Sequence, residues 1–169
     1  MSASTQEHRD QAPSEISCAV VTVSDTRTKE TDRSGPIIRD TLQAAGHRIA
    51  DYRIVPDESD EIRRALDELA SRDDIDAIVF NGGTGIARRD TTFDVIDRLL
   101  EKRIDGFGEL FRMLSWDEIG PAAMLSRATA GTYRDTLVFL TPGSSNAVRL
   151  AMDRLIAPEV AHMVFEVRK

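Results

Sequence analysis

The sequence predicts an α/β fold built on a mostly parallel sheet. Short runs of apolar, β-branched residues alternate along the chain with segments whose apolar residues recur at helical spacing. The runs are apolar at consecutive positions, as expected of strands that helices cover on both faces. With 169 residues, 41% of them hydrophobic, the chain is long enough for one domain and too short for two of typical size.

The first half of the chain contains three strand candidates and two helix candidates. The strands are expected over residues 16–24, 48–55 and 76–80. The first helix begins near Ser34-Gly35-Pro36, where a proline suits the first turn, and Gly46 ends it. The second helix starts at Glu58, and its apolar residues recur at helical spacing as far as Leu69.

The second half continues the alternation less regularly. Residues 92–100 again have helical spacing, whereas residues 105–111 (DGFGELF) are expected to form a glycine-rich loop before a mixed region around Trp116. Residues 136–140 form the next strand candidate. The last helix is expected after TPGSSN, and four of its residues should face inward: Val148, Ala151, Met152 and Leu155.

Composition limits location and partners. Residues 1–14 are polar and lack a hydrophobic signal core, so we expect a disordered tail there, a single domain over residues 15–169 and a cytoplasmic protein. The net charge of -7 opposes a nucleic-acid footprint and adhesion to an anionic membrane. Because Cys18 is the only cysteine, the chain can form no intrachain disulfide and no cysteine metal cluster; a buried, hydrophobic role is expected.

Four strand-to-helix loops contain most of the unusual chemistry: residues 24–28, 56–59, 81–92 and 141–146. They should converge, because the ligand crevice of an open α/β sheet lies beyond the carboxyl ends of its strands. Glycines in the third and fourth loops let the backbone approach a phosphate closely. A Walker loop is disfavoured because Ile86 and Ala87 follow Gly85, and the dinucleotide fingerprint fails because Arg88 replaces its third glycine.

Each of these features also has a purely structural interpretation. Glycines in such loops can serve only to turn the chain, and Asp57, just before a helix, can be a helix cap. Arg88 and Arg89 can be solvated surface charges. Asp90 is harder to explain structurally, since the following threonines can cap the next helix and leave its carboxylate free.

The ordered motifs GGTGIARRDTT, DGFGELFRMLSWDEIGPAAMLSRATAG and LVFLTPGS resemble the MoaB/MogA family of molybdenum cofactor biosynthesis. The similarity extends from Ile16 to about His162. It implies a three-layer α-β-α fold, assembly as a trimer or a dimer of trimers, and binding of the dithiolene pterin molybdopterin. It also implies an adenylyltransferase that joins AMP from Mg-ATP to the terminal phosphate of molybdopterin.

The resemblance assigns roles to individual residues. Asp57 and Asp90 correspond to the catalytic aspartates, and hard carboxylate oxygens suit Mg²⁺ bound with substrate phosphates. Glu109 is expected to touch the pterin. The remaining substrate- and nucleotide-binding residues are expected at the strand ends: Ser24, Asp25, Gly82, Gly83, Thr84, Gly85, Pro142, Gly143 and Ser144.

Two other classes of function stay open. A non-catalytic carrier would deliver molybdopterin to the molybdenum-insertion enzyme through the same loops, and a structural subunit would use the glycines only as turns. The presence of both Asp57 and Asp90 favours the enzyme. Homo-oligomer formation is expected in either case, because an exposed cluster of Phe107, Phe111, Leu114 and Trp116 would be an unusually apolar patch.

Overall fold

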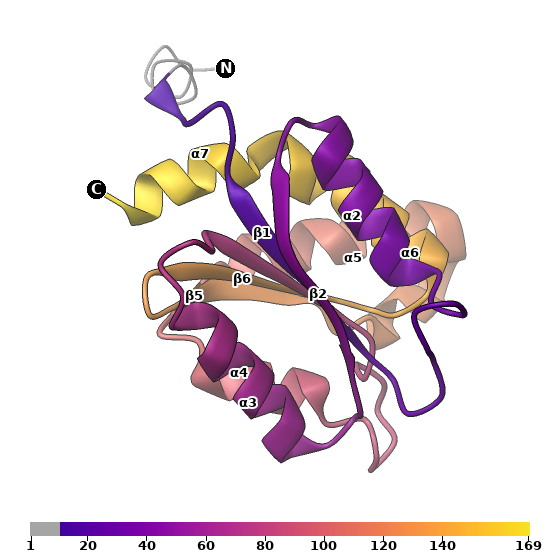
Figure 1. Cartoon of the computed structure of the whole chain (residues 1–169). Coiled ribbons are helices and arrows are strands. Elements are labelled where there is room, and N and C mark those ends of the chain that lie inside the picture. The colour runs from indigo at the N-terminus through magenta and orange to yellow at the C-terminus, as the bar shows by residue number, and fades with distance from the viewer. Residues whose placement is uncertain (1–10) are drawn as a thin grey trace.

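A mixed sheet in the order β2-β1-β3-β6-β5-β4 forms the centre of the computed structural model, which describes residues 11–169 (Figure 1). β1 pairs in parallel with β2 and β3, and β3 pairs in parallel with β6. β5 is antiparallel to both β6 and β4. The strands are β1 (Ser17–Val23), β2 (Arg48–Val55), β3 (Ala77–Asn81), β4 (Lys102–Arg103), β5 (Thr129–Tyr133) and β6 (Thr136–Thr141). The predicted mostly parallel α/β sheet is confirmed.

Helices cover both faces of this sheet, so the predicted three layers are also confirmed (Figure 1). α2, α5, α6 and α7 pack on one face, and α3 and α4 pack on the other. The helical segments are α2 (Ser34–Ala44), α3 (Ser59–Ala70), α4 (Thr92–Leu99), α5 (Asp105–Ile119), the 3-10 helix η1 (Gly120–Leu125), α6 (Ser145–Ala151), the π-helical turn η2 (Met152–Ile156) and α7 (Ala157–Val167).

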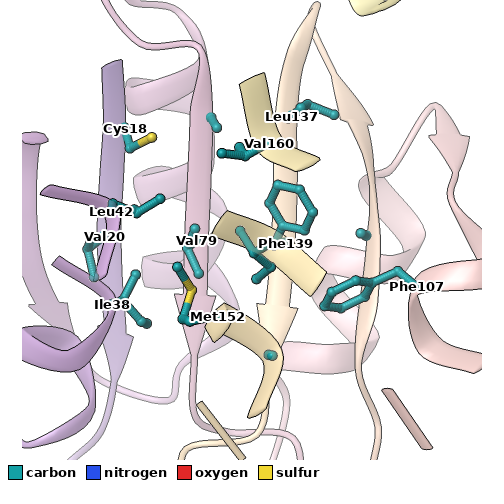
Figure 2. Packing of buried hydrophobic residues seen from close by; sticks show 14 of the residues in the cluster. Cys18, Val20, Ile38, Leu42, Val79, Phe107, Leu137, Phe139, Met152 and Val160 are labelled. Atoms are coloured by element: carbon teal, nitrogen blue, oxygen red, sulfur yellow. The ribbon is translucent and has the colours of Figure 1, made fainter. Parts of the chain in front are cut away.

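Residues 18–21 of β1 are apolar at consecutive positions because helices cover both faces of the strand. Cys18 and Val20 face the layer of α2 and α7, while Ala19 and Val21 face the layer of α3 and α4. Figure 2 shows Cys18 and Val20 beside Leu42 of α2 within the first layer. Burial raises the pKa of the Cys18 thiol to about 12, so this cysteine is a buried apolar side chain, as predicted.

The prediction of a glycine-rich loop over residues 105–111 is wrong, because these residues form the first two turns of α5. Phe107 and Phe111 are buried in the core, and the ring of Phe107 meets that of Phe139 edge-on at 5.6 Å (Figure 2). This burial outweighs the low helix propensity of glycine. Gly108 is needed for packing, since a Cβ atom there would lie 2.7 Å from the carbonyl oxygen of Ala128.

The antiparallel strands β4 and β5 were not predicted. β5 joins β6 through a two-residue turn in which Arg134 and Asp135 have φ of 48° and 61°. Such hairpin turns usually contain Asn-Gly or Asp-Gly, whereas the two residues of this turn are Arg134 and Asp135. β4 has only two residues, too few to give a periodic signal.

The final helix is interrupted by the π-helical turn η2, which changes the face that its residues present. Val148, Ala151 and Met152 are buried as predicted, but Leu155 is only half-buried and Ile156 is buried in its place. A π-helical turn contains more residues than an α-helical turn, so the next inward-facing side chain comes one residue later. A prediction that assumes a constant spacing of 3.6 residues therefore places Leu155 inward instead of Ile156.

The predicted tail over residues 1–14 falls mainly on residues 1–10, which lie outside those that the structure describes. In residues 11–169, no helix combines the length and apolarity that crossing a bilayer requires. The cytoplasmic location stays a prediction.

Candidate functional site

The loops at the carboxyl ends of β1, β2, β3 and β6 contact one another. The Ser34 hydroxyl donates a hydrogen bond of 2.7 Å to the carbonyl oxygen of Gly143. The backbone N–H of Asp57 donates to Asp25 Oδ1 at 2.9 Å, and Arg89 forms an ion pair with the same carboxylate. These bonds join all four loops in pairs, so their predicted convergence is confirmed.

The glycine loop, residues 82–91, follows β3 in a backbone conformation that glycine permits. Gly82 and Gly83 have φ of 97° and 62°. A Cβ atom on Gly82 would come within 3.0 Å of the carbonyl oxygen of Val23, and one on Gly83 would overlap Thr92 and Asp57. Packing between the loops therefore requires both glycines, whatever the loop binds.

The glycine loop also leaves backbone donors free. The N–H groups of Gly83, Thr84, Gly85 and Ile86 have no hydrogen-bond acceptor among residues 11–169. Successive backbone N–H groups without a protein acceptor can form a concave site for an anion. The loop is therefore suited to bind phosphate oxygens.

The strand-end cavity, of about 350 Å³, lies where the loops after β1, β3 and β6 meet. Four of the predicted binding residues line it: Ser24, Gly82, Gly143 and Ser144. Its other polar and charged lining residues were not named as binding residues from the sequence: Thr22, Arg27, Asp32, Arg33, Ser34, Asn81 and Ser145. Ser144 also caps α6 by accepting a hydrogen bond from the N–H of Ala147, so it has a structural role as well.

Three buried polar residues occupy matching positions on adjacent parallel strands, with Asn81 paired in register with both Thr22 and Thr141. Asn81 Nδ2 donates to Thr22 Oγ1 at 3.0 Å. Among the described residues, Asn81 Oδ1 and Thr141 Oγ1 have no hydrogen-bond partner. Their signal in the sequence is a polar residue at the last or next-to-last position of a largely apolar strand.

Asp32 anchors the loop between β1 and α2. It is buried and accepts four hydrogen bonds, from the Thr22 and Tyr52 hydroxyls and from the N–H groups of Ser34 and Gly35. Burial alone would raise the pKa of Asp32, but these four bonds together outweigh it and hold the pKa below its usual value. The carboxylate is therefore ionised at neutral pH and fixes one wall of the strand-end cavity.

Because folding lowers the pKa of Asp32, its charge stabilises the fold above the unfolded-state pKa of about 3.9, and this contribution is lost as pH falls through the folded-state value. We expect Asp32→Asn to lower the free energy of unfolding by about 2–3 kcal/mol between pH 5 and 8. The difference from the wild type should shrink below about pH 4. Urea unfolding across this pH range checks the prediction; a difference that stays constant to pH 3 would contradict it.

The α3–α4 groove, of about 490 Å³, lies beside the later part of the glycine loop. Asp90 and Thr91 line it together with apolar residues such as Ile86, which is 74% exposed. It also contains four arginines: Arg63, Arg88, Arg98 and Arg127. Gly82 lines the strand-end cavity, while residues 86–88, 90 and 91 line this groove, so the glycine loop reaches from one to the other.

Asp57 lies between the loops and lines neither cavity. Its Oδ1 atom accepts hydrogen bonds from the N–H of Thr91 at 3.1 Å, from the Thr91 hydroxyl at 2.9 Å and from the Thr92 hydroxyl at 3.3 Å. The interpretation of Asp57 as the N-terminal cap of α3 is wrong, because Glu58 occupies the cap position. Asp57 instead accepts hydrogen bonds at the start of α4. The threonines expected to cap α4 make no side-chain cap bond and donate to Asp57.

The other predicted residues take different positions. Thr84 is buried in the glycine loop, and Pro142 is half-buried beside Gly143. Asp25 links the loops through Asp57 and Arg89 rather than lining a cavity. Glu109 is on α5 and lines a separate cavity of about 270 Å³, so the structure does not bring it together with the strand-end residues.

Asp57 and Asp90 offer the hard carboxylate oxygens that Mg²⁺ prefers as ligands. The described residues contain no group of three or more His, Cys, Asp or Glu side chains that could hold a metal. Asp57 Oδ2 and Asp90 Oδ1 accept no hydrogen bond from residues 11–169, whereas the other oxygen of each carboxylate accepts at least one. This arrangement fits Mg²⁺ held by one or two carboxylates together with substrate phosphates, and not a complete protein cage.

Comparison with known proteins gives consistent matches. The family model described as "Probable molybdopterin binding domain" matches residues 19–162. Molybdenum cofactor biosynthesis protein B of Bacillus subtilis is 54% identical over 167 residues, covering 98% of both chains. A crystal structure of molybdenum cofactor biosynthesis protein B superposes with a TM-score of 0.90 at 51% identity, covering 94% of this chain and 99% of that one. The tungsten cofactor synthesizing protein MoaB from Pyrococcus furiosus gives a TM-score of 0.84 at 39% identity, covering 94% and 100%.

Proposed function

This chain belongs to the molybdopterin-binding domain family and acts in molybdenum cofactor biosynthesis, and we propose that it is a molybdopterin adenylyltransferase. In this reaction an oxygen of the terminal phosphate of molybdopterin attacks the α-phosphorus of ATP. The bond from that phosphorus to the bridging oxygen breaks, and pyrophosphate leaves with the bonding electrons. The adenylylated pterin would then pass to the molybdenum-insertion enzyme.

The observation that supports this reaction best is the position of the glycine loop between two cavities. A transfer between two phosphate-bearing substrates requires two sites that adjoin, and the glycine loop joins the two cavities here, with Gly82 in one and Ile86 in the other. The N–H groups of residues 83–86 between them have no hydrogen-bond acceptor among residues 11–169. We assign the pterin phosphate to the strand-end cavity, where the Ser24 and Ser144 side chains also line the wall. The nucleotide then occupies the α3–α4 groove.

The groove offers the chemistry that a nucleotide triphosphate needs. Arg88 and Arg98 form no hydrogen bond or ion pair with residues 11–169, so their charges are available to phosphate oxygens. Val95 and Leu99 add apolar surface suited to a base. Positioning and charge neutralisation account for most of the catalysis in phosphoryl transfer.

Asp57 and Asp90 would hold Mg²⁺ through their unbonded oxygens, together with the phosphates. When bound, the ion supplies positive charge that offsets the charge of the phosphates. Asp90 lines the groove and is the better placed of the two. Asp57 also holds the glycine loop to α4, so it serves structure as well.

The direct test is incubation of the purified protein with molybdopterin, ATP and Mg²⁺, followed by mass spectrometry of the pterin. Formation of adenylylated molybdopterin with release of pyrophosphate is the expected result. Binding of molybdopterin without product, at any ATP concentration, would exclude the transferase and leave the carrier. Failure to bind molybdopterin, phosphate or AMP would leave only the structural subunit.

A non-catalytic molybdopterin carrier is the second candidate function, because Asp57 does not by itself require a metal. The three hydrogen bonds that its carboxylate accepts from Thr91 and Thr92 serve the fold, so its presence has a structural reason without any metal. Asp90 has a weaker structural reason, a single bond of 3.2 Å from the N–H of Ala87. The transferase therefore depends most on Asp90.

We also propose a closed homo-oligomer, a trimer or a dimer of trimers, although the predicted contact cluster needs correction. Phe107 and Phe111 are buried within their own chain, and only Trp116 of the four aromatic and apolar residues is well exposed, at 55%. Met113 and Met124 line one cavity with Trp116 and form a different apolar patch. Three more apolar residues of α5 and η1 are exposed: Leu110, Ile119 and Leu125. A patch of this kind on one face marks an interaction site.

Light scattering at micromolar concentration should give at least three times the chain mass of 18.8 kDa. Met124→Glu, which puts a charge at the most exposed residue of the patch, should lower the measured mass. Arg39→Glu on α2, away from the patch, is the control. A wild-type mass of one chain would contradict the proposal.

A further inference from the structure

We infer that Arg127 is a positioning residue that fixes the direction of the free N–H groups in the glycine loop. This inference rests on the proposed phosphate-binding role of that loop. Arg127 lies in the segment between η1 and β5, about forty residues from the loop in sequence. Sequence reasoning gave it no role.

Arg127 binds the glycine loop through two carbonyl groups. Its Nε donates to the carbonyl oxygen of Thr84 at 3.0 Å, and one terminal nitrogen donates to that of Gly85 at 2.6 Å. No other donor among the described residues bonds to these two oxygens. The guanidinium fork can reach two successive carbonyls at once, which a lysine ammonium cannot do with the same geometry.

The rest of the side chain is held against α4. The Arg127 guanidinium lies 4.7 Å from the centre of the Phe93 ring, and its terminal nitrogens pair with Asp94 at 3.3 Å. The side chain is 25% exposed. Because α4 is a regular element packed on the sheet, the guanidinium has a fixed position from which to bind the loop.

The hydrogen bonds from Arg127 to the two carbonyl groups also orient the backbone N–H groups that adjoin them. In a trans peptide the C=O of one residue and the N–H of the next point in opposite directions. Carbonyls of Thr84 and Gly85 that point toward Arg127 therefore direct the N–H groups of Gly85 and Ile86 away from it. These are two of the four unpaired donors, so Arg127 determines the side of the loop on which they face a ligand.

The functional and structural roles of Arg127 predict different results. A residue that only joins the loop to α4 would change stability without a specific effect on anions. A positioning residue changes anion affinity even when the fold is intact, because freed peptide groups rotate and lose their common direction. An added guanidinium ion can replace the lost group, and a methylammonium ion cannot supply the same fork.

The test measures binding of inorganic phosphate by ³¹P NMR titration, and kcat and KM with Mg-ATP and molybdopterin. Arg127→Ala is expected to raise the phosphate Kd about 10- to 100-fold. Guanidinium at millimolar concentration should restore part of the affinity, and methylammonium should not. Arg127→Lys, which keeps the charge and most of the packing, should still bind at least several-fold more weakly than the wild type.

Two controls separate this role from the loss of an ion pair. Arg103→Ala removes a pair between β4 and Asp97 of α4 without touching the loop, and should leave the phosphate Kd within twofold. Asp94→Asn keeps both carbonyl bonds of Arg127 and should also have a small effect. If the wild type binds phosphate and folded Arg127→Ala and Arg127→Lys bind it equally well, the inference is wrong. If the wild type binds no phosphate, the proposed function itself fails.

Discussion

Replacing Asp90 with asparagine is expected to lower the rate of AMP transfer on the order of 100- to 1000-fold, while molybdopterin still binds. Asparagine keeps the size of the side chain and an oxygen that can accept from the N–H of Ala87. It removes the negative charge that makes Mg²⁺ binding favourable. Loss of one preorganised electrostatic group has an effect of this size in other enzymes.

The measurement is single-turnover formation of adenylylated pterin, with molybdopterin affinity and melting temperature determined on the same samples. Asp153→Asn, which neutralises an exposed carboxylate outside both cavities, should change the rate less than twofold. A loss of pterin binding together with several degrees of melting temperature in Asp90→Asn would show that Asp90 is a structural anchor.

Asp57→Asn gives a second comparison. We expect a similar loss of rate together with lower stability, since its Oδ1 atom accepts three hydrogen bonds. If both carboxylates serve one metal, the double variant should lose less than the sum of the single effects. Additive losses would indicate that the two carboxylates act independently.

Gly82→Ala is expected to destabilise the fold by about 2–5 kcal/mol. The backbone has φ of 97°, which an L side chain rarely adopts, and the added Cβ would press on the carbonyl oxygen of Val23. A backbone atom of β1, which is paired with a strand on each side, cannot move away without disrupting the sheet. At roughly 2–4 °C per kcal/mol for a domain of this size, the melting temperature should fall by roughly 4–20 °C.

Gly106→Ala is the matched control, because nothing lies within 4 Å of a Cβ added at this position in α5. We expect it to stabilise the protein by about 0.5–1 kcal/mol, as alanine favours the helix. Calorimetry of both variants compares the same chemical change in opposite environments. Equal melting temperatures would show that the converging loops tolerate a side chain at Gly82.

The sequence alone determined the α/β class and the convergence of four loops. These predictions depend on local properties: consecutive apolar residues predict a strand buried on both faces, and the carboxyl ends of parallel strands share one edge. Cys18 and the cluster of glycines after Phe80 were understood on the same basis. Each residue type limits the backbone or its own burial, independently of distant contacts.

Only the tertiary structure decided the features that depend on residues far apart in the chain. Burial of Phe107 and Phe111 against the sheet turned an expected glycine loop into a helix, and a hairpin turn without glycine concealed β5. Asp57 accepts hydrogen bonds from a helix more than thirty residues away, and Arg127 reaches back more than forty residues to the glycine loop. Local pattern cannot reveal such bonds, because their energy comes from partners that only the folded backbone brings within hydrogen-bonding distance.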